Sequence, residues 1–279
     1  MLPDTIRYFL SKRGKLAKSI TEAGGFIKSS DSVNRPDVQL HMLPLLFDDS
    51  GRDLKLMSNS GYSVHVCVLR PKSSGKLFAF STALSLELAG KKQVIIPGAN
   101  WIAGYDPGDG SEIWRAWHGG YSVVPRPLYG HGLVYFSSSF DQAKLFAIRP
   151  DGKGEVTKTH IAWRTNRGAA YVPSPIVEGS YFLVVSDNGI ASCFTAKDGN
   201  RLWMERLGGG HSASTVSAGG LVYFVSDKGV TTVVRPGAKF DVISKNELGE
   251  RCSASPAISS GTIYIRGHKN LFAIRTTRK

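Results

Sequence analysis

Apolar residues in the second half of the chain come in short runs of four or five, separated by turns that contain glycine. The central residues of four such runs, Tyr135, Leu183, Tyr223 and Tyr264, are spaced 48, 40 and 41 residues apart. Short apolar runs bounded by turn signals predict buried β-strands, and helical periodicity is absent from this region. The regular spacing indicates an internal repeat of about 40 residues.

Each repeat adds further strand signals around this apolar run. A segment rich in small residues and proline precedes it, and an outer strand with a tryptophan (Trp114, Trp163 or Trp203) closes three of the repeats. The strand between them contains Leu145-Phe-Ala-Ile-Arg in one repeat and the same five residues from Leu271, 126 residues later. Four short strands per 40 to 50 residues are typical of a β-propeller blade. The fold class predicted here is all-β, with each tryptophan packing across to the next blade.

Counting strands predicts about five four-stranded blades. An earlier unit comprises strands at 82–88, 93–97, 101–106 and 112–117, whereas the last repeat, from Cys252, supplies only three strands. We expect residues 76–80 to close the ring by pairing with residues 271–275, because an open ring leaves unpaired strand edges. A fragment of a larger propeller fits the same pattern.

Residues 1–75 lack this repeat and are expected to form a separate, small β-rich appendage to a propeller at 76–279. Alternating patterns predict strands at 38–43, 54–57 and 64–69. A piece this small depends on contacts outside itself for order.

Composition limits the function classes. The net charge is +13, but the basic residues are dispersed, which favours a solvated basic surface with weak polyanion binding over a nucleic-acid platform. Cys67, Cys193 and Cys252 are too few for a disulfide framework and are expected to be buried free thiols. The sequence contains no apolar run long enough to span a membrane and no secretory signal pattern, so we expect a cytoplasmic chain as given.

The repeats resemble those of pyrroloquinoline-quinone-type propellers over about 200 residues. The motifs on which the resemblance depends are two turn-and-strand segments, Asp106…Gly110…Trp114 and Ala196-Lys-Asp-Gly199…Trp203. This repeat class includes quinone-dependent dehydrogenases and non-enzymatic assembly scaffolds, so the resemblance implies fold more than function. It also implies a periplasmic or extracytoplasmic location for a full-length parent. The adjacent cysteines that hold quinone in the dehydrogenases are missing, so no cofactor is expected.

Residues 1–75 resemble part of the substrate domain of glucose–methanol–choline flavin oxidoreductases. The motifs include Glu22-Ala-Gly-Gly-Phe, Arg35-Pro-Asp-Val-Gln-Leu-His-Met and Gly61-Tyr-Ser-Val-His-Val-Cys-Val. The dinucleotide-binding Gly-x-Gly-x-x-Gly element and the C-terminal histidine region of that family are missing here. The chain therefore reads as a chimera of two truncated gene pieces without flavin chemistry.

Candidate site residues come from aligning the first segment of each blade, which should line the central channel. The alignment makes Tyr171, His211 and Cys252 equivalent to Val123, and these three are the candidate catalytic set. The candidate ligand-binding set is Arg126, Ser174, Ser214 and Ser255. No paired histidine spacing suggests a metal site. These side chains could equally just fill a narrow channel, and the aspartates in the hairpin turns, such as Asp187 and Asp227, are expected there for backbone reasons.

Three functions follow from these patterns. The first is a non-enzymatic scaffold that binds a protein or a small ligand on its channel face, with homodimer formation favoured if the ring is open. The second is a low-efficiency hydrolase of esters, lactones or phosphoesters, in which His211 activates Cys252. The third is a quinone-dependent oxidoreductase. A colourless purified protein would exclude bound quinone, and turnover lost in His211→Ala or Cys252→Ala would support the hydrolase.

Overall fold

The computed structural model describes residues 81–139 and 143–275, together with the backbone of three strands at 23–27, 38–43 and 63–68. The chain divides into two compact units, Met1–Ser74 and Gly75–Lys279. Every regular element in the described residues is a β-strand, as the sequence pattern predicts. No helix in the described ranges is long and apolar enough to cross a membrane.

The first unit contains one antiparallel sheet in the order β1-β2-β3. Its strands are β1 (Ala23–Ile27), β2 (Val38–Leu43) and β3 (Ser63–Val68). The strands expected at 38–43 and 64–69 are therefore confirmed, and the one expected at 54–57 lies outside the described residues. Strand β1 was not predicted, because it contains two glycines and glycine is depleted in strands.

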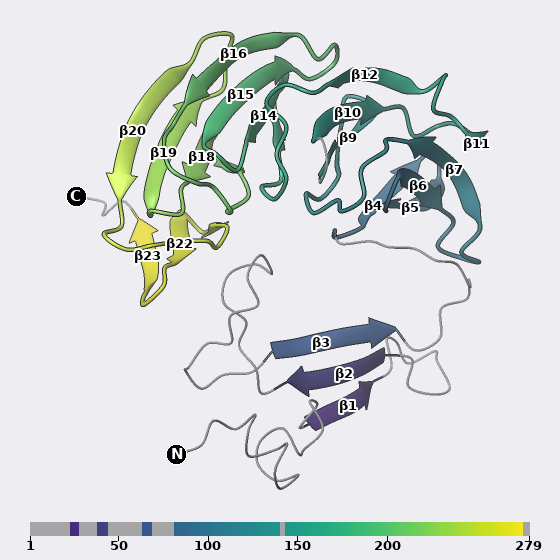
Figure 1. Cartoon of the computed structure of the whole chain (residues 1–279), viewed down its shortest axis with the longest axis horizontal. Coiled ribbons are helices and arrows are strands. Elements are labelled where there is room, and N and C mark those ends of the chain that lie inside the picture. The colour runs from purple at the N-terminus through teal and green to yellow at the C-terminus, as the bar shows by residue number, and fades with distance from the viewer. Residues whose placement is uncertain (1–22, 28–37, 44–62, 69–80, 140–142, 276–279) are drawn as a thin grey trace, which may run out of the picture. The chain divides into compact units, whose positions relative to one another are not determined.

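The described residues of the second unit form five sheets that follow one another in chain order along an arc, antiparallel except for one short parallel strand in the first sheet (Figure 1). The first sheet contains β4 (Leu84–Leu88), β5 (Lys91–Pro97), β6 (Trp101–Tyr105) and β7 (Glu112–Trp117), and the second contains β8 (Leu128–Gly130), β9 (Leu133–Ser138), β10 (Lys144–Ile148) and β12 (Ile161–Thr165). The third contains β13 (Ile176–Glu178), β14 (Tyr181–Val185), β15 (Ile190–Thr195) and β16 (Arg201–Arg206). The fourth contains β17 (Val216–Ala218), β18 (Leu221–Val225), β19 (Val230–Arg235) and β20 (Asp241–Glu247), and the last contains β21 (Ala257–Ser259), β22 (Thr262–Arg266) and β23 (Leu271–Arg275).

The innermost strands correct one expectation. Strands were expected to start at Tyr121, Tyr171, His211 and Cys252, but β8, β13, β17 and β21 are only three residues long and begin five to seven residues later. Proline has no N–H to give to a sheet ladder, which explains the late start in three of these segments; the one from His211 contains no proline. Arg126, Ser174, Ser214 and Ser255 therefore lie just before the inner strands rather than in them.

A short strand, β11 (Gly154–Glu155), joins the first sheet from the second repeat. It pairs in parallel with β7, placing Gly154 opposite Trp114 and Glu155 opposite Arg115. The Val156 N–H continues the pairing by donating to the Arg115 carbonyl at 2.9 Å. This cross-connection ties the outer edges of two neighbouring sheets together.

The cores lie between sheets, because each sheet turns one face to the preceding sheet and the other to the following one. In the second sheet, Phe136 and Phe146 pack toward the first sheet, whereas Tyr135 and Leu145 pack toward the third. Tyr135 stacks on Phe182 of the third sheet with ring centroids 5.3 Å apart. Two-faced burial explains why the middle strands read as continuous apolar runs.

Outer-strand tryptophans connect successive sheets, as the sequence predicts. The Trp163 Nε1–H donates to the Ala196 carbonyl of the third sheet at 2.9 Å, and the Trp203 Nε1–H donates to the Gly237 carbonyl of the fourth at 3.0 Å. Both rings also contact aromatic neighbours, including Phe240, whose ring centroid lies 4.9 Å from that of Trp203. Each tryptophan thus gives both buried apolar area and a hydrogen bond to the same junction.

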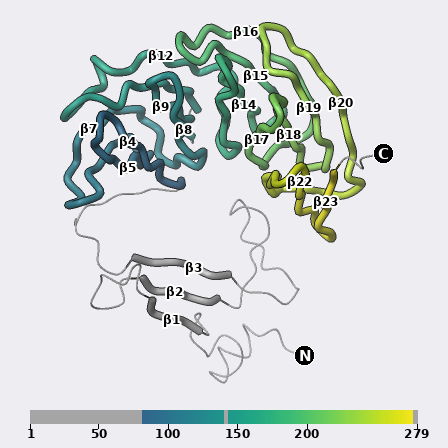
Figure 2. The backbone as a smooth tube through the Cα atoms, turned by 180° about the vertical axis from the view of Figure 1, so that it is seen from behind, coloured from purple at the N-terminus to yellow at the C-terminus, as the bar shows by residue number. Residues whose placement is uncertain are grey.

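The arc has two ends. The first and last sheets lie at opposite ends of it in both views (Figures 1 and 2). The last sheet has three described strands, β21, β22 and β23, and residues 76–80, expected to complete it, lie outside the described residues. Ring closure by that segment therefore stays a prediction.

Candidate functional site

The four predicted ligand-binding residues lie along one line of hydrogen bonds that crosses from sheet to sheet. The Arg126 N–H donates to Ser174 Oγ at 3.0 Å, the Ser174 N–H to Ser214 Oγ at 3.1 Å, and the Ser214 N–H to Ser255 Oγ at 2.9 Å. Their predicted equivalence thus has a structural basis, since each serine hydroxyl accepts from the equivalent position of the preceding repeat. These hydroxyls fasten neighbouring sheets at their inner ends, and we name this feature the serine ladder.

The hairpin aspartates support the same inner segments. Asp187 Oδ2 accepts from the Tyr171 N–H at 2.6 Å, and the Asp187 carbonyl accepts from the His211 N–H at 3.0 Å. Asp227 repeats the pattern one sheet later, with Oδ1 accepting from the Ser212 N–H at 2.9 Å. Each carboxylate therefore binds the backbone of the inner segment of its own repeat, 16 and 15 residues away, whereas the sequence prediction placed its role in its own hairpin turn.

The predicted catalytic set is distributed over three neighbouring sheets. Tyr171 is exposed, whereas His211 and Cys252 are buried at the starts of the fourth and fifth repeats. The Cys252 N–H donates to the Asp227 carbonyl at 3.1 Å, so Asp227 lies next to both buried residues. Asp227 therefore lies next to His211 and Cys252, whereas Asp187 lies next to Tyr171 and His211.

The protonation states of this pair are those of neutral groups. Burial lowers the pKa of His211, opposed by the nearby charges of Asp227 and Asp187. Burial raises the pKa of the Cys252 thiol, and Asp227 and Glu250 raise it further. The thiol lies 3.2 Å from the Arg266 carbonyl, to which it donates, and His211 Nδ1 has no hydrogen-bond partner among the described residues. A nucleophilic cysteine needs a stabilised thiolate, and this environment opposes one.

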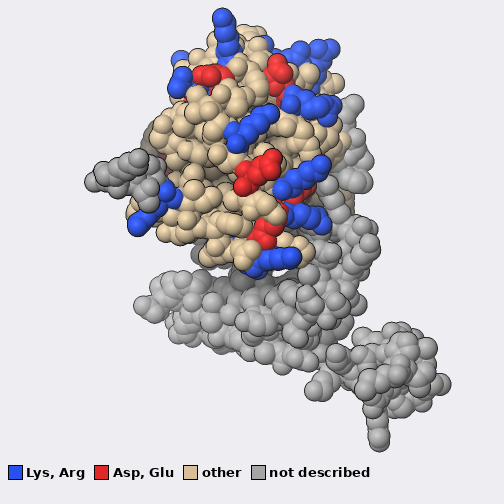
Figure 3. Space-filling model, turned by 90° about the vertical axis from the view of Figure 1, so that its left-hand side faces the viewer, with Lys and Arg blue, Asp and Glu red and all other residues tan. Residues whose placement is uncertain are grey.

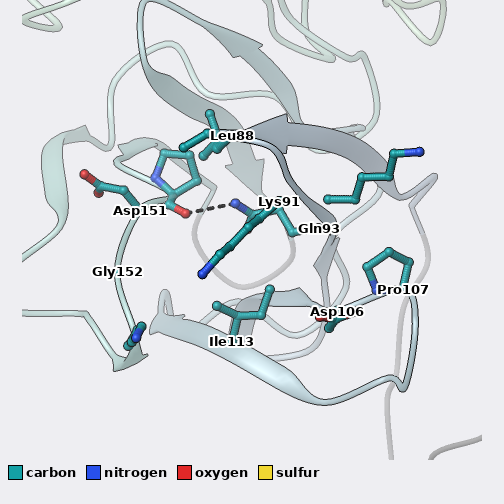
Figure 4. A pocket seen from close by; sticks show the side chains of 12 residues that line it. Leu88, Lys91, Gln93, Asp106, Pro107, Ile113, Asp151 and Gly152 are labelled. Atoms are coloured by element: carbon teal, nitrogen blue, oxygen red, sulfur yellow. Dashed lines mark hydrogen bonds between the residues drawn. The ribbon is translucent and has the colours of Figure 1, made fainter.

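A pocket of about 610 Å³ lies between the first sheet and the turn that follows β10 (Figure 4). Gln93 forms its buried polar wall: the Trp114 Nε1–H donates to Gln93 Oε1 at 2.7 Å, and Gln93 Nε2 donates to the Pro150 carbonyl at 3.0 Å. The side-chain amide of Gln93 thus links Trp114 to the second sheet, whereas Trp163 and Trp203 bond to the next sheet directly. Lysines and aspartates both line the pocket mouth, so its charge selects no single kind of ligand.

The most distinctive surface is one face of the last sheet. Strand register places Tyr264 opposite Ala273 and Arg266 opposite Leu271, so their side chains share a face. The opposite face of β22 carries Ile265, which is buried against the fourth sheet. The shared face is exposed, with 67% of Leu271 and 40% of Tyr264 accessible to solvent. We name this surface the terminal face.

Sequence reasoning missed the serine ladder, and it predicted an exposed blade face such as the terminal face only for an open ring. The signal for the second was present, because the pentapeptide starting at Leu271 repeats the one starting at Leu145, which is buried. A sequence match cannot tell whether another sheet covers the second copy. The sequence predicts basic residues dispersed over the surface. Figure 3 shows acidic side chains between basic ones over the part of the second unit in view.

Comparisons with known proteins find relatives of two kinds. The family described as outer membrane protein assembly factor BamB matches residues 98–279. The crystal structure of BamB from Moraxella catarrhalis aligns with a TM-score of 0.42 and 13% identity, covering 85% of this chain and 81% of that one.

Curated relatives match a shorter stretch. An alcohol dehydrogenase [acceptor] from Pseudomonas putida is 41% identical over 70 residues, and the mitochondrial choline dehydrogenase of Mus musculus is 39% identical over 72. These stretches make up 25% and 26% of this chain and 12% of each relative. The chain therefore spans about an eighth of the length of these curated relatives.

Proposed function

Since this chain belongs over residues 98–279 to the family described as outer membrane protein assembly factor BamB, we propose that its propeller is a non-enzymatic scaffold that binds a partner protein. The observation that carries the proposal is the exposed terminal face. In the second sheet the corresponding residues, Tyr135 and Leu145, are fully buried by the third sheet. The last sheet thus presents a surface of the kind that this repeat normally covers with protein.

The chemistry of the terminal face suits a protein interface. Tyr264 and Leu271 form an apolar centre, and the exposed Arg266 and Arg275 lie on the same face by register. Tyrosine and arginine are among the residue types that dominate binding energy in protein interfaces. Large exposed apolar patches rimmed by polar residues mark interaction sites on protein surfaces.

The charge commits the proposal to an acidic partner. Both rim residues are arginines, and the chain carries a net charge of +13, which opposes association of two copies. A partner whose apolar strip is flanked by Asp or Glu would pair with both arginines. A second copy of this chain, the homodimer of the sequence prediction, is the competing occupant.

Site-specific photo-cross-linking tests the proposal in extract from the source cells. A benzoylphenylalanine at position 271 should cross-link one partner with an acidic contact peptide, and the double variant Arg266→Glu/Arg275→Glu should abolish that product. The matched control places the same probe at position 204, where Met204 is 44% exposed on the third sheet. Equal products from both positions, or only a cross-link to a second copy, would overturn the proposal.

The hydrolase alternative rests on Cys252 and His211, and the raised pKa of the thiol stands against it. Similarity to two unrelated families, one of them over only about a quarter of the chain, supports the idea that two gene pieces are joined here. On that view the first unit retains part of an oxidoreductase substrate domain without its chemistry. Absorption of the purified protein above 350 nm would contradict this and favour a bound flavin or quinone.

A further inference from the structure

A pocket of about 640 Å³ lies between the end of β7 and strands β10 and β12. Its wall includes Trp117 and His118 after β7, Lys144 and Phe146 from β10, and Arg164 from β12. We name it the β7–β12 pocket. It lies within the second unit, and its lining differs from that of the pocket around Gln93.

The charged residues that the structure describes around the β7–β12 pocket are all basic. They are Lys144 and Arg164, and none of the described lining residues is an aspartate or glutamate. Among the ion pairs found in the described part of the chain, none involves either cation. Two cations that share an open pocket without a carboxylate create a local positive potential that favours an anion.

The repeat itself does not require these cations. By the register of the third sheet, Met204 stands where Arg164 stands, directly after the outer-strand tryptophan. Strands β10 and β15 both have a shift in register, after Ala147 and after Cys193. Three residues before these positions lie Lys144 and Ile190, which are therefore equivalent. The next sheet thus folds with apolar residues at both positions. The first and fourth sheets carry a cation at the Arg164 position only, Arg115 and Lys245, so Lys144 is the cation that is particular to this pocket.

Aromatic rings make up the rest of the wall. Trp117 is 44% exposed, and its ring meets Trp101 edge-on with centroids 4.9 Å apart. The Trp117 N–H donates to Thr157 Oγ1 at 2.9 Å, which fixes the backbone at this point. Phe146, almost wholly buried, also lines the pocket. A flat ring can stack on such a wall at little entropic cost.

His118 contributes a neutral wall rather than a third charge. Its Nδ1 accepts from the Gly120 N–H at 3.0 Å, so its proton lies on Nε2, which donates to the Gly98 carbonyl at 3.0 Å. Burial lowers the pKa of His118 to about 4, and the nearby Lys144 ammonium acts in the same direction. At neutral pH the pocket therefore offers the two cations and the aromatic wall.

We propose that the β7–β12 pocket binds a small organic anion in which a carboxylate or phosphate is joined to a flat aromatic ring. The Arg164 guanidinium can hold two oxygens of the anion at once, and Lys144 adds a point charge. Trp117 receives the ring. This site is independent of the terminal face and of its partner.

Calorimetric titration of the full chain tests the proposal with 2-naphthoate and 2-naphthyl phosphate, and with uncharged 2-naphthylmethanol. We expect saturable one-to-one binding of both anions and none of the alcohol. Lys144→Gln and Arg164→Gln should each weaken binding about tenfold or more, because each removes a charged hydrogen-bond donor. Trp117→Ala should weaken it several-fold.

The matched controls are Lys158→Gln and Arg206→Gln, which remove the same charges from exposed positions outside the pocket. Their affinities should equal that of the unchanged protein. Equal weakening by pocket and control variants would mean general surface attraction and would overturn the proposal. So would unchanged affinity in Lys144→Gln, or an absence of binding by the unchanged protein.

Discussion

Leu145 and Leu271 occupy the same position in two identical pentapeptides, yet Leu145 is fully buried and 67% of Leu271 is exposed. Leu145 packs against Phe182 and its neighbours in the third sheet. No sheet follows the one that carries Leu271 in the described residues. The local sequence is the same, so the difference lies entirely in what covers each strand.

Truncating the two leucines should therefore have very different effects. We expect Leu145→Ala to lower the free energy of unfolding by about 2–5 kcal/mol, because it leaves a cavity between two sheets. Leu271→Ala should change it by less than about 0.5 kcal/mol. Urea unfolding followed by tryptophan fluorescence measures both, since all five tryptophans belong to the second unit. Equal losses would show that the terminal face is covered within the chain.

The serine ladder should contribute to stability whether or not it binds a ligand. Ser214→Ala removes the acceptor for the Ser174 N–H, and we expect a loss of about 1 kcal/mol in the free energy of unfolding. Ser259→Ala, at an exposed position of β21, is the matched control and should have no measurable effect. An unchanged stability in Ser214→Ala would contradict this structural role of the hydroxyl.

Acid should destabilise the second unit through its buried histidines. The pKa of His118 is about 4 in the folded protein and 6.5 as its ordinary value, so the unfolded chain binds more protons between these values. Stability is therefore full above about pH 6.5 and falls as the pH drops toward 4, with a loss on the order of 2 kcal/mol at pH 5 from this residue. The pKa of His211 is lowered too and acts in the same direction.

Denaturation at pH 7 and pH 5 in the unchanged protein and in His118→Asn measures the contribution of His118. The variant should be less stable at pH 7, because the hydrogen bonds to Gly98 and Gly120 are altered, but should lose less on acidification. His131→Asn, which changes an exposed histidine, should keep the full pH dependence. A variant His118→Asn with the same acid loss as the unchanged protein would contradict this assignment.

Cys252 should behave as an inert thiol. Its raised pKa and its donation to the Arg266 carbonyl predict slow alkylation by iodoacetamide at pH 7.5 in the folded protein and rapid alkylation in urea. Peptide mass mapping separates this cysteine from Cys67 and Cys193. Fast modification in the folded state that is lost in His211→Ala would support the hydrolase hypothesis, in which His211 activates Cys252.

Most of the fold could be predicted because its signals are local. The apolar runs around Tyr135 and Tyr223 and the turns at Asp187 and Asp227 specify strands and hairpins, and the tryptophans predict the links between sheets. Some of these turns require glycine. At Gly189 the φ angle is 77°, and a Cβ there would collide with the Gly209 carbonyl. Strands β1 and β11 were missed because glycine weakens the first and only two residues form the second.

The candidate sites could be predicted less well because they depend on distant pairs. Alignment of the repeats made Ser174, Ser214 and Ser255 equivalent. It did not predict that the hydroxyl of each serine accepts a hydrogen bond from the repeat before it. The β7–β12 pocket joins Trp117 to Lys144 and Arg164 across two sheets, and no spacing in the sequence announces it.

The affinity of the cross-linked partner for single-site variants tests the central claim most directly. By calorimetry, Tyr264→Ala and Leu271→Ala should each weaken binding by about tenfold or more, as expected of interface hot spots, without lowering the unfolding midpoint. Met204→Ala, at the control position, should bind as the unchanged protein does. Unchanged affinity in both terminal-face variants would contradict a scaffold that binds its partner through the last sheet.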